Sequence, residues 1–273
     1  MKKYLIVLDL DGTLLYDWET LKEETVTYLK KIKALGHQLV IATGRPFRSS
    51  ERYYTMLELD TPIINYNGGL VSWPNHDTFK EISLNLNKDD VVDIFEKNKM
   101  YIENGFCEIK EDIYLLEEKD DIMPLLHYFN GAKLHVGHFK ETLPKGPNGF
   151  IIVAKPGKGA FIEDYVRTNY QGKILSRNWG NEYNFIIELF TPQTNKGTAL
   201  EYVAKTLGFK QEDIIAFGDG HNDIEMLKYA GLGVAMHNAH NELLEVADVV
   251  SPYTNQENAI EKFLEDFLNK KNS

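Results

Sequence analysis

Two aspartates stand two residues apart, directly after an apolar run near the start of the chain. The run 4–8 (YLIVL) leads into DLDGT, which places Asp9 and Asp11 beside Gly12. At this spacing both carboxylates can face one side, and the glycine lets the chain turn sharply. One ionised carboxylate can attack phosphorus, while a second protonates the departing oxygen and later deprotonates water. The pair predicts phosphoryl transfer. The competing interpretation is a solvated acidic turn. It is disfavoured because the two aspartates directly follow the N-terminal strand of an α/β chain.

Thr43, Gly44 and Arg45 follow a second apolar run, 38–42 (QLVIA). A hydroxyl, a bare backbone N–H and a following helix N-terminus are suited to hold a phosphate group. Taken alone the signal is weak, since most such turns only cap a helix. The turn NYNGG at 65–69 closes a third run in a similar way, and there a structural turn is the favoured interpretation.

Lys196 stands at the first position of an amphipathic segment, 196–207. A lysine at a helix N-terminus opposes the helix macrodipole, at a cost of roughly a few tenths of a kcal/mol. An anion held at this position would remove that cost. The alternative is a surface lysine whose aliphatic stem packs on its neighbours.

A second pair of aspartates, Asp219 and Asp223, surrounds the loop GDGHND at the end of another apolar run. Together with Asp9 and the backbone carbonyl of Asp11 they form an oxygen-rich set of ligands. Such ligands, with room for waters, suit Mg²⁺ rather than zinc. A divalent ion would offset the repulsion between the carboxylates and draw charge from a transferring phosphoryl group. His221 has no second histidine at ligand spacing and is interpreted as a loop residue.

Apolar, β-branched runs recur towards both ends of the chain and end in polar or glycine-rich turns. Such runs are typical of strands buried on both faces of a parallel sheet, and they lie at 4–8, 38–42, 62–66, 213–217, 232–236 and 248–250. Amphipathic segments separate them, at 20–35, 196–207, 223–229 and 259–268. The alternation predicts βαβ crossovers in a doubly wound α/β sheet, whose site lies outside the carboxyl ends of the strands.

The middle of the chain has a different pattern and predicts an inserted domain. Strand-like and helix-like segments are mixed there, with turns such as LPKGPNG and KPGKG. We expect an α+β insert at 84–188 and a core formed by 1–83 and 189–273, with hinges at the flanking segments. Six side chains of the insert are candidates for contacts with a substrate, with packing or surface exposure as the favoured interpretation of each: Tyr114, His135, His138, Arg177, Trp179 and Tyr183.

The composition is that of a globular protein. Of 273 residues 43% are hydrophobic and 26% are charged, and the formal net charge is −11. A diffuse acidic surface repels phosphate backbones, so no nucleic-acid partner is expected. No apolar stretch reaches the ~18 residues of a membrane span. The one cysteine, Cys107, fits a reducing compartment,, so we expect a soluble cytoplasmic protein.

The motifs DLDGT, ATGR, NKG and GDGHND, in this order, resemble those of the haloacid dehalogenase (HAD) superfamily of phosphotransferases. The insert between ATGR and NKG is similar to the type-2 (C2B) cap of the Cof-like sugar-phosphatase branch. The tail GLGVAMHNAHNELLEVADVVSPYTNQENAI also resembles that branch. The resemblance covers nearly the whole chain and implies a Rossmann-like HAD core with an inserted α+β cap.

The resemblance also implies roles for individual residues. Asp9 matches the nucleophile and a Mg²⁺ ligand, and Asp11 matches the general acid/base, with its backbone carbonyl on the metal. Lys196 matches the lysine that holds nucleophile and phosphate together. Asp219 matches an acidic Mg²⁺ ligand, and Asp223 belongs to a supporting pair at or behind the metal. Because a halide leaving group needs no proton, Asp11 favours phosphoryl transfer over dehalogenation.

Phosphate-binding positions follow in the same way. Backbone amides at Leu10 and Gly12 match those that meet the phosphate, and Thr43 and Gly44 match a binding hydroxyl and amide. Two side chains complete the phosphate set: Lys196 and Asn222. One departure stands in the tail, where the branch usually has AMGNA and this chain has a histidine, His237, in the glycine position. Its role stays open.

The expected function is a Mg²⁺-dependent phosphatase acting on a small phosphorylated metabolite, such as a sugar phosphate, through an aspartyl phosphate. Two alternatives remain. A phosphomutase of the same fold would return the phosphoryl group to a second sugar hydroxyl. A non-catalytic sensor would bind a metabolite without turnover, although it would not need the acid/base Asp11. The substrate stays open, and so does the choice between monomer and homodimer.

Overall fold

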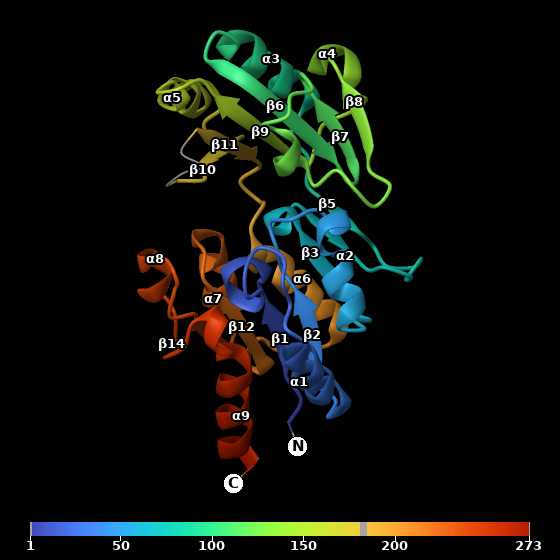
Figure 1. Cartoon of the computed structure of the whole chain (residues 1–273), viewed down its shortest axis with the longest axis vertical. Coiled ribbons are helices and arrows are strands. Elements are labelled where there is room, and N and C mark those ends of the chain that lie inside the picture. The colour runs from blue at the N-terminus through green and yellow to red at the C-terminus, as the bar shows by residue number, and fades with distance from the viewer. Residues whose placement is uncertain (1, 181–184, 273) are drawn as a thin grey trace. The chain divides into compact units, whose positions relative to one another are not determined.

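The chain folds into two compact units (Figure 1). The computed structural model describes residues 2–180 and 185–272. The first unit, the core unit, holds the described residues up to Arg45, Ser50–Ile82 and the described residues from Asn195 on. The second unit holds Pro46–Ser49 and the described residues of Ser83–Thr194.

The core unit is built on a five-stranded sheet in the order β14-β13-β12-β1-β2. Its strands are β1 Leu5–Leu8, β2 Gln38–Ile41, β12 Ile214–Gly218, β13 Leu232–Ala235 and β14 Val249–Val250. Every neighbouring pair is parallel, and Figure 1 shows β1, β2 and β12 side by side. The predicted doubly wound α/β sheet is therefore confirmed.

The predicted strand at 62–66 exists, but it lies outside this sheet. Strand β3 (Ile63–Asn65) pairs antiparallel with β4 (Leu70–Ser72), in a three-stranded sheet with β5 (Ile82–Ser83). An isolated parallel bridge joins Ala42 to Ile64. The chain reverses through a tight turn in which Tyr66 and Asn67 take positive φ values of 51° and 54°. A crossover helix, α2 (Phe47–Met56), joins β2 to β3, and the bridge from Ala42 to Ile64 is parallel. The hairpin comes after β3 and pairs it with β4, so, within the described residues, β3 pairs with the five-stranded sheet only through that bridge,.

Helices cover both faces of the parallel sheet. The helices are α1 Glu23–Ala34, α2 Phe47–Met56, α6 Lys196–Leu207, α7 Ile224–Tyr229, α8 Asn241–Leu244 and α9 Ala259–Asn272. Helices α6 and α7 pack on the face that carries Leu5 and Val7. On the opposite face Phe263 of α9 meets Phe217 of β12 edge to face, with ring centroids 5.5 Å apart. Helix α1 contacts α9.

Helix α1 begins three residues later than the periodicity predicts. The segment before it is a closed loop, in which the Tyr16 N–H donates to the Thr20 carbonyl at 2.9 Å. The Asp17 carboxylate accepts from the backbone N–H groups of Glu19 and Thr20 at 2.7 and 2.6 Å. Because these bonds compete with helical ones, the helix starts only at Glu23,.

The second unit is a six-stranded sheet with helices on one face. The strand order is β10-β11-β9-β6-β7-β8, antiparallel except for the parallel pair β7–β8. The elements are α3 Lys88–Asn98, β6 Ile102–Ile109, β7 Asp112–Leu115, β8 Lys133–Val136, α4 Phe139–Thr142, β9 Gly149–Ala154, α5 Gly159–Asn169, β10 Leu175–Asn178 and β11 Ile186–Phe190. The sequence did not predict β6, whose apolar run is interrupted by Asn104, Gly105 and Glu108.

Among the helices of residues 2–180 and 185–272, none has both the length and the apolar character that crossing a membrane requires.

Candidate active site

Asp9 lies at the carboxyl end of β1, where the chain leaves the sheet. Its N–H donates to the Phe217 carbonyl at 3.1 Å, which continues the β1–β12 ladder by one residue. The next five residues, Leu10–Leu14, form one wide turn that closes with the Leu15 N–H on the Leu10 carbonyl at 2.9 Å. Wide turns of this kind are frequent at functional sites. Here the turn leaves the Asp9 side chain at the sheet edge, only 5% exposed.

Lys196 connects two of the predicted carboxylates. It is the first residue of α6, and Asn195 caps the helix by accepting from the Thr198 N–H at 2.7 Å. The buried Nζ lies 2.5 Å from Oδ1 of Asp9 and 2.6 Å from Oδ1 of Asp223. A surface lysine, the alternative interpretation, is therefore excluded.

The loop after β12 supplies Asp219 and Asp223. Oδ2 of Asp223 accepts from the N–H groups of Asp219 and Gly220, at 3.0 and 2.9 Å. Asp219 in turn accepts from Oγ1 of Thr13 at 2.8 Å, which ties this loop to the one after β1. The structure thereby brings together residues that are more than 200 positions apart.

Asp9, Asp219 and Asp223 each offer a carboxylate oxygen within 4.8 Å of the others. When all three are ionised, three carboxylates against one ammonium leave two negative charges in excess, which one divalent cation would balance. Burial, and then the neighbouring carboxylates, raise the pKa of Asp9 despite the opposing effect of Lys196. Burial and Asp223 raise the pKa of Asp219 to about 7. A cation bound here would stabilise the ionised carboxylates, so this acidic, oxygen-only group fits Mg²⁺.

Burial also acts on Lys196, where it disfavours the charged form. The two adjacent carboxylates, first Asp223 and then Asp9, outweigh it and raise the pKa of Lys196 above its usual value. The ammonium therefore stays protonated at neutral pH and can counter the charge of a phosphate group.

The remaining predicted residues differ in their burial and in their contacts. Thr43 is fully buried and its Oγ1 accepts from the Arg45 N–H at 3.1 Å, whereas Gly44 is exposed. Asn222 donates through Nδ2 to Oδ1 of Asn67 at 2.8 Å. The turn at 65–69, interpreted above as structural, therefore also holds a residue of the predicted site. The sequence offered no signal for this side-chain contact.

Gly12 occupies a position that a larger residue cannot share with Asp219. Its φ is +73°, and a Cβ there would lie 2.2 Å from Oδ2 of Asp219. We expect Gly12→Ala to lose turnover and to lower the free energy of unfolding by more than the ~1–2 kcal/mol of a left-handed backbone alone. Denaturant unfolding and phosphate release measure the two effects.

Gly208 provides a matched control for that substitution in the same unit. Its φ is +78°, but a Cβ there would meet nothing within 4 Å. Gly208→Ala should therefore show the backbone cost with normal turnover. Equal losses of stability and activity in the two variants would contradict a role for the contact between Gly12 and Asp219.

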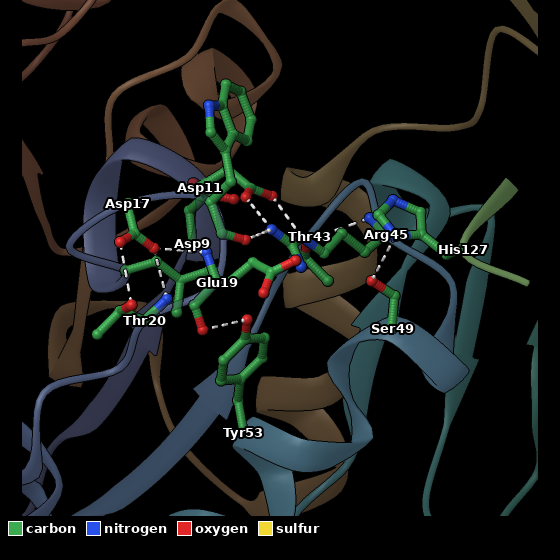
Figure 2. A network of polar contacts seen from close by, with 12 residues as sticks. Asp9, Asp11, Asp17, Glu19, Thr20, Thr43, Arg45, Ser49, Tyr53 and His127 are labelled. Carbon is green, nitrogen blue, oxygen red and sulfur yellow. Dashed lines mark hydrogen bonds and ion pairs between the residues drawn. The ribbon is translucent and has the colours of Figure 1, made fainter. Parts of the chain in front are cut away.

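The Asp11 side chain does not join the carboxylate cluster. It faces Arg45, whose Nε donates to Oδ2 at 2.8 Å and whose Nη2 donates to Oδ1 (Figure 2). Sequence reasoning placed Arg45 only in a phosphate-binding turn and missed this ion pair. No pattern in the sequence indicates that Arg45 would pair with a carboxylate 34 residues earlier.

Two further predictions concern exposed histidines. His237, in place of the glycine, is exposed, and its N–H donates to the Tyr253 carbonyl at 3.2 Å. The next residue, Asn238, reaches the predicted site, because its Nδ2 donates to the Gly12 carbonyl at 2.8 Å. His221 is exposed and pairs with Glu242 at 3.0 Å.

Four of the six candidates for substrate contacts in the insert have side-chain contacts within the second unit. Those with such contacts are Tyr114, His135, His138 and Arg177. The rings of Tyr114 and His135 stack with centroids 4.6 Å apart, and Arg177 lies 3.7 Å from Glu188. Trp179 is exposed, and Tyr183 lies outside the described residues.

Comparisons with known proteins identify the family of this chain. A sequence model of the haloacid dehalogenase-like hydrolases matches residues 6–264. The chain is 34% identical to the 5-amino-6-(5-phospho-D-ribitylamino)uracil phosphatase YitU of Bacillus subtilis, over 98% of both chains. It is 29% identical to the pyridoxal phosphate phosphatase YbhA of Escherichia coli, over 92% of this chain and 93% of that protein.

A solved structure shows the same architecture. The haloacid dehalogenase-like hydrolase from Bacteroides thetaiotaomicron superimposes with a TM-score of 0.82 at 26% identity, covering 97% of this chain and all of the other. The family match spans both units, and the relatives align over nearly their full length. The chain therefore belongs to the haloacid dehalogenase-like hydrolases, as a Cof-type phosphatase.

Proposed function

We propose that this chain is a Mg²⁺-dependent phosphatase that hydrolyses a small phosphorylated metabolite through an aspartyl phosphate on Asp9. One observation carries the proposal. The buried ammonium of Lys196 lies between Asp9 and Asp223, with a carboxylate oxygen of Asp219 within 4.8 Å of theirs. This arrangement supports Asp9 as the nucleophile, Lys196 as a fixed positive charge and the three carboxylates as metal ligands.

The first half of the reaction forms a bond between an Asp9 oxygen and phosphorus while the bond from phosphorus to the alcohol oxygen breaks. Asp11 gives its proton to that oxygen, so the product leaves as a neutral alcohol. In the second half, water attacks the aspartyl phosphate and Asp11 takes back a proton. Lys196 keeps its proton throughout and balances charge on the phosphoryl group.

Asp9, Asp219 and Asp223, with the Asp11 carbonyl, are the groups that would hold Mg²⁺. When bound, the ion supplies positive charge to the oxygens of the transferring group. Backbone N–H groups at Leu10 and Gly12, the Gly44 amide and the side chains of Thr43 and Asn222 would hold the phosphate. We also propose that the insert at 84–188 acts as a cap that excludes water and selects the substrate.

The names of the relatives narrow the proposed substrate. YitU acts on a phosphorylated ribitylamino-uracil and YbhA on pyridoxal phosphate, so both substrates join a phosphate to a molecule with a heterocyclic ring. We propose an organic phosphate monoester of this kind or a sugar phosphate. A phosphate-release screen over sugar phosphates, flavin precursors, pyridoxal phosphate and nucleotides tests this proposal. An isomerised sugar phosphate without free phosphate would instead indicate a mutase, and no turnover across the panel would indicate a sensor.

Metal binding can be tested apart from activity. We expect Mg²⁺ to raise the melting temperature of the wild type, because a ligand at about 100 times its Kd adds about 2.7 kcal/mol to stability. Asp219→Asn should lose most of this shift, and chelation should abolish turnover in the wild type. The control is Asp248→Asn, since Asp248 is exposed and accepts from the Gly233 N–H outside the cluster. An equal shift of the melting temperature in both variants would show that the metal does not bind at Asp219.

A further inference from the structure

Arg45 holds the side chain of Asp11 with a two-pronged ion pair. Its Nε donates to Oδ2 at 2.8 Å and its Nη2 donates to Oδ1, so both carboxylate oxygens are engaged. The Nη2 group also donates to the Trp18 carbonyl at 2.5 Å. The arginine side chain is 9% exposed and the aspartate side chain 27%. Fork-to-fork pairs of this type fix the plane of a carboxylate as well as its position.

The backbone of Arg45 is held on both sides of the residue. Its N–H donates to Oγ1 of Thr43 at 3.1 Å. Its carbonyl accepts from Nδ2 of Asn65 at 2.9 Å and from the Tyr66 N–H at 3.3 Å. The guanidinium carbon lies 5.8 Å from the centre of the Tyr53 ring. The side chain therefore starts from a fixed point in the strand-end turn.

The third partner of the guanidinium, the Trp18 carbonyl, is fixed independently. It belongs to the closed loop that precedes α1, in which Asp17 accepts from the N–H groups of Glu19 and Thr20. The hydroxyl of Tyr53 donates to the Glu19 carbonyl at 2.9 Å (Figure 2). Both ends of the arginine are thus anchored to groups other than Asp11.

The fork places the Asp11 carboxylate without using all of its acceptor sites. An ionised carboxylate has about four lone-pair positions, and the two oxygens each receive one arm of the guanidinium. Each oxygen therefore keeps a lone pair that can accept or carry the transferred proton. The Asp11 side chain is also outside the metal-ligand group found among the described residues, Asp9, Asp219 and Asp223. The fork therefore opposes rotation about the two side-chain bonds of Asp11.

We infer that Arg45 is a positioning residue for proton transfer by Asp11, an inference that rests on the proposed function. Arg45 keeps its own protons. The Asp11 carboxyl group gives one proton to the bridging oxygen as the phosphorus–oxygen bond breaks, and takes one from water in the second half. Arg45 fixes where that carboxyl group stands. Its loss should therefore impair only those substrates whose leaving group needs the proton.

The test compares kcat/KM for two esters, since kcat/KM reports steps up to departure of the alcohol. An alkyl phosphate needs a proton on its leaving oxygen, whereas p-nitrophenyl phosphate releases a stable phenolate without one. We expect Asp11→Asn to lower kcat/KM for the alkyl ester by about 10²-fold or more. Arg45→Met should lower it by about 10- to 100-fold, with a change of less than about threefold for p-nitrophenyl phosphate.

A double variant separates positioning from direct contact with the phosphate. If Arg45 acts through Asp11, adding Arg45→Met to Asp11→Asn should cause no further loss on the alkyl ester. Arg45→Lys keeps the charge but not the planar fork, so it should stay impaired on the alkyl ester. The matched control is Arg52→Met. Arg52 donates to the Glu19 carbonyl of the same loop at 3.1 Å, and its loss should leave the ratio of the two esters unchanged.

The outcomes distinguish this inference from the proposed function. An equal loss of Arg45→Met on both esters, an additional loss in the Asp11→Asn background, or full activity of Arg45→Lys would each overturn the positioning role. If Asp11→Asn itself leaves the ratio of the two esters unchanged, the acid/base assignment fails instead. Melting curves of Arg45→Met and Arg45→Lys show whether each variant is folded. The kinetic comparison uses the variant whose melting temperature equals that of the wild type.

Discussion

Asp9→Asn should abolish turnover, with a loss on the order of 10³-fold or more, because an amide cannot form the covalent bond to phosphorus. The variant is nearly isosteric with the wild type. It leaves Lys196 paired with Asp223 at 2.6 Å. Phosphate release from the best substrate of the screen, together with trapping of the phosphoryl-enzyme, measures the effect. A turnover rate within a few-fold of the wild-type rate, in a preparation free of wild-type enzyme, would refute Asp9 as the nucleophile.

The fold of that variant should remain intact, which separates the loss of activity from unfolding. In the metal-free protein, burial and neighbouring carboxylates raise the pKa of Asp9 above its unfolded value. A raised carboxyl pKa means that stability is lost as the pH rises through the folded value, since the ionised group is disfavoured inside. A neutral amide at this position removes that cost. Metal-free Asp9→Asn should therefore melt at or above the temperature of the wild type at neutral pH.

Lys196→Met should cost both activity and stability. Methionine has a similar length and no charge, so it can replace the buried stem of Lys196, but it leaves the carboxylates of Asp9 and Asp223 without their ammonium partner. Breaking a buried ion pair from one side typically costs about 3–5 kcal/mol. We expect a loss of that size in denaturant unfolding, together with a higher KM and a lower kcat, because the lysine also balances phosphate charge.

Lys205 offers the control in the same helix. Its side chain is 71% exposed and pairs with Glu201 at 2.6 Å, four residues earlier. Lys205→Met should change the free energy of unfolding by less than about 1 kcal/mol, since exposed pairs contribute little. It should leave kcat and KM unchanged. Similar losses in the two variants would show that the helix, rather than the buried charge, is responsible.

The local elements were largely predictable because each depends on neighbouring residues. Strand β1 and helix α6 follow from hydrophobic runs and periodicity, and α6 begins at Lys196 as predicted. Where side-chain bonds compete with the periodic pattern, the prediction was wrong. Asp17 delays the start of α1. Strand β3 differs for another reason, because it pairs antiparallel with β4 and, in the described part of the chain, keeps only one parallel bridge, from Ile64 to Ala42, towards the predicted sheet.

For the candidate site, the amino-acid sequence determined which residues would gather. Parallel strands end at one edge, so polar residues placed after β1, β2 and β12 must share that edge. Asp9 and Asp223 are found there, and Lys196, which follows no strand of this sheet, joins them from the first position of α6. The pairing of side chains was decided only by the tertiary structure. Arg45 pairs with Asp11, and Asn222 donates a hydrogen bond to Asn67. These contacts depend on side-chain directions and on distances of a few ångströms between loops that are far apart in the chain. The spacing of residues along the chain does not encode either quantity.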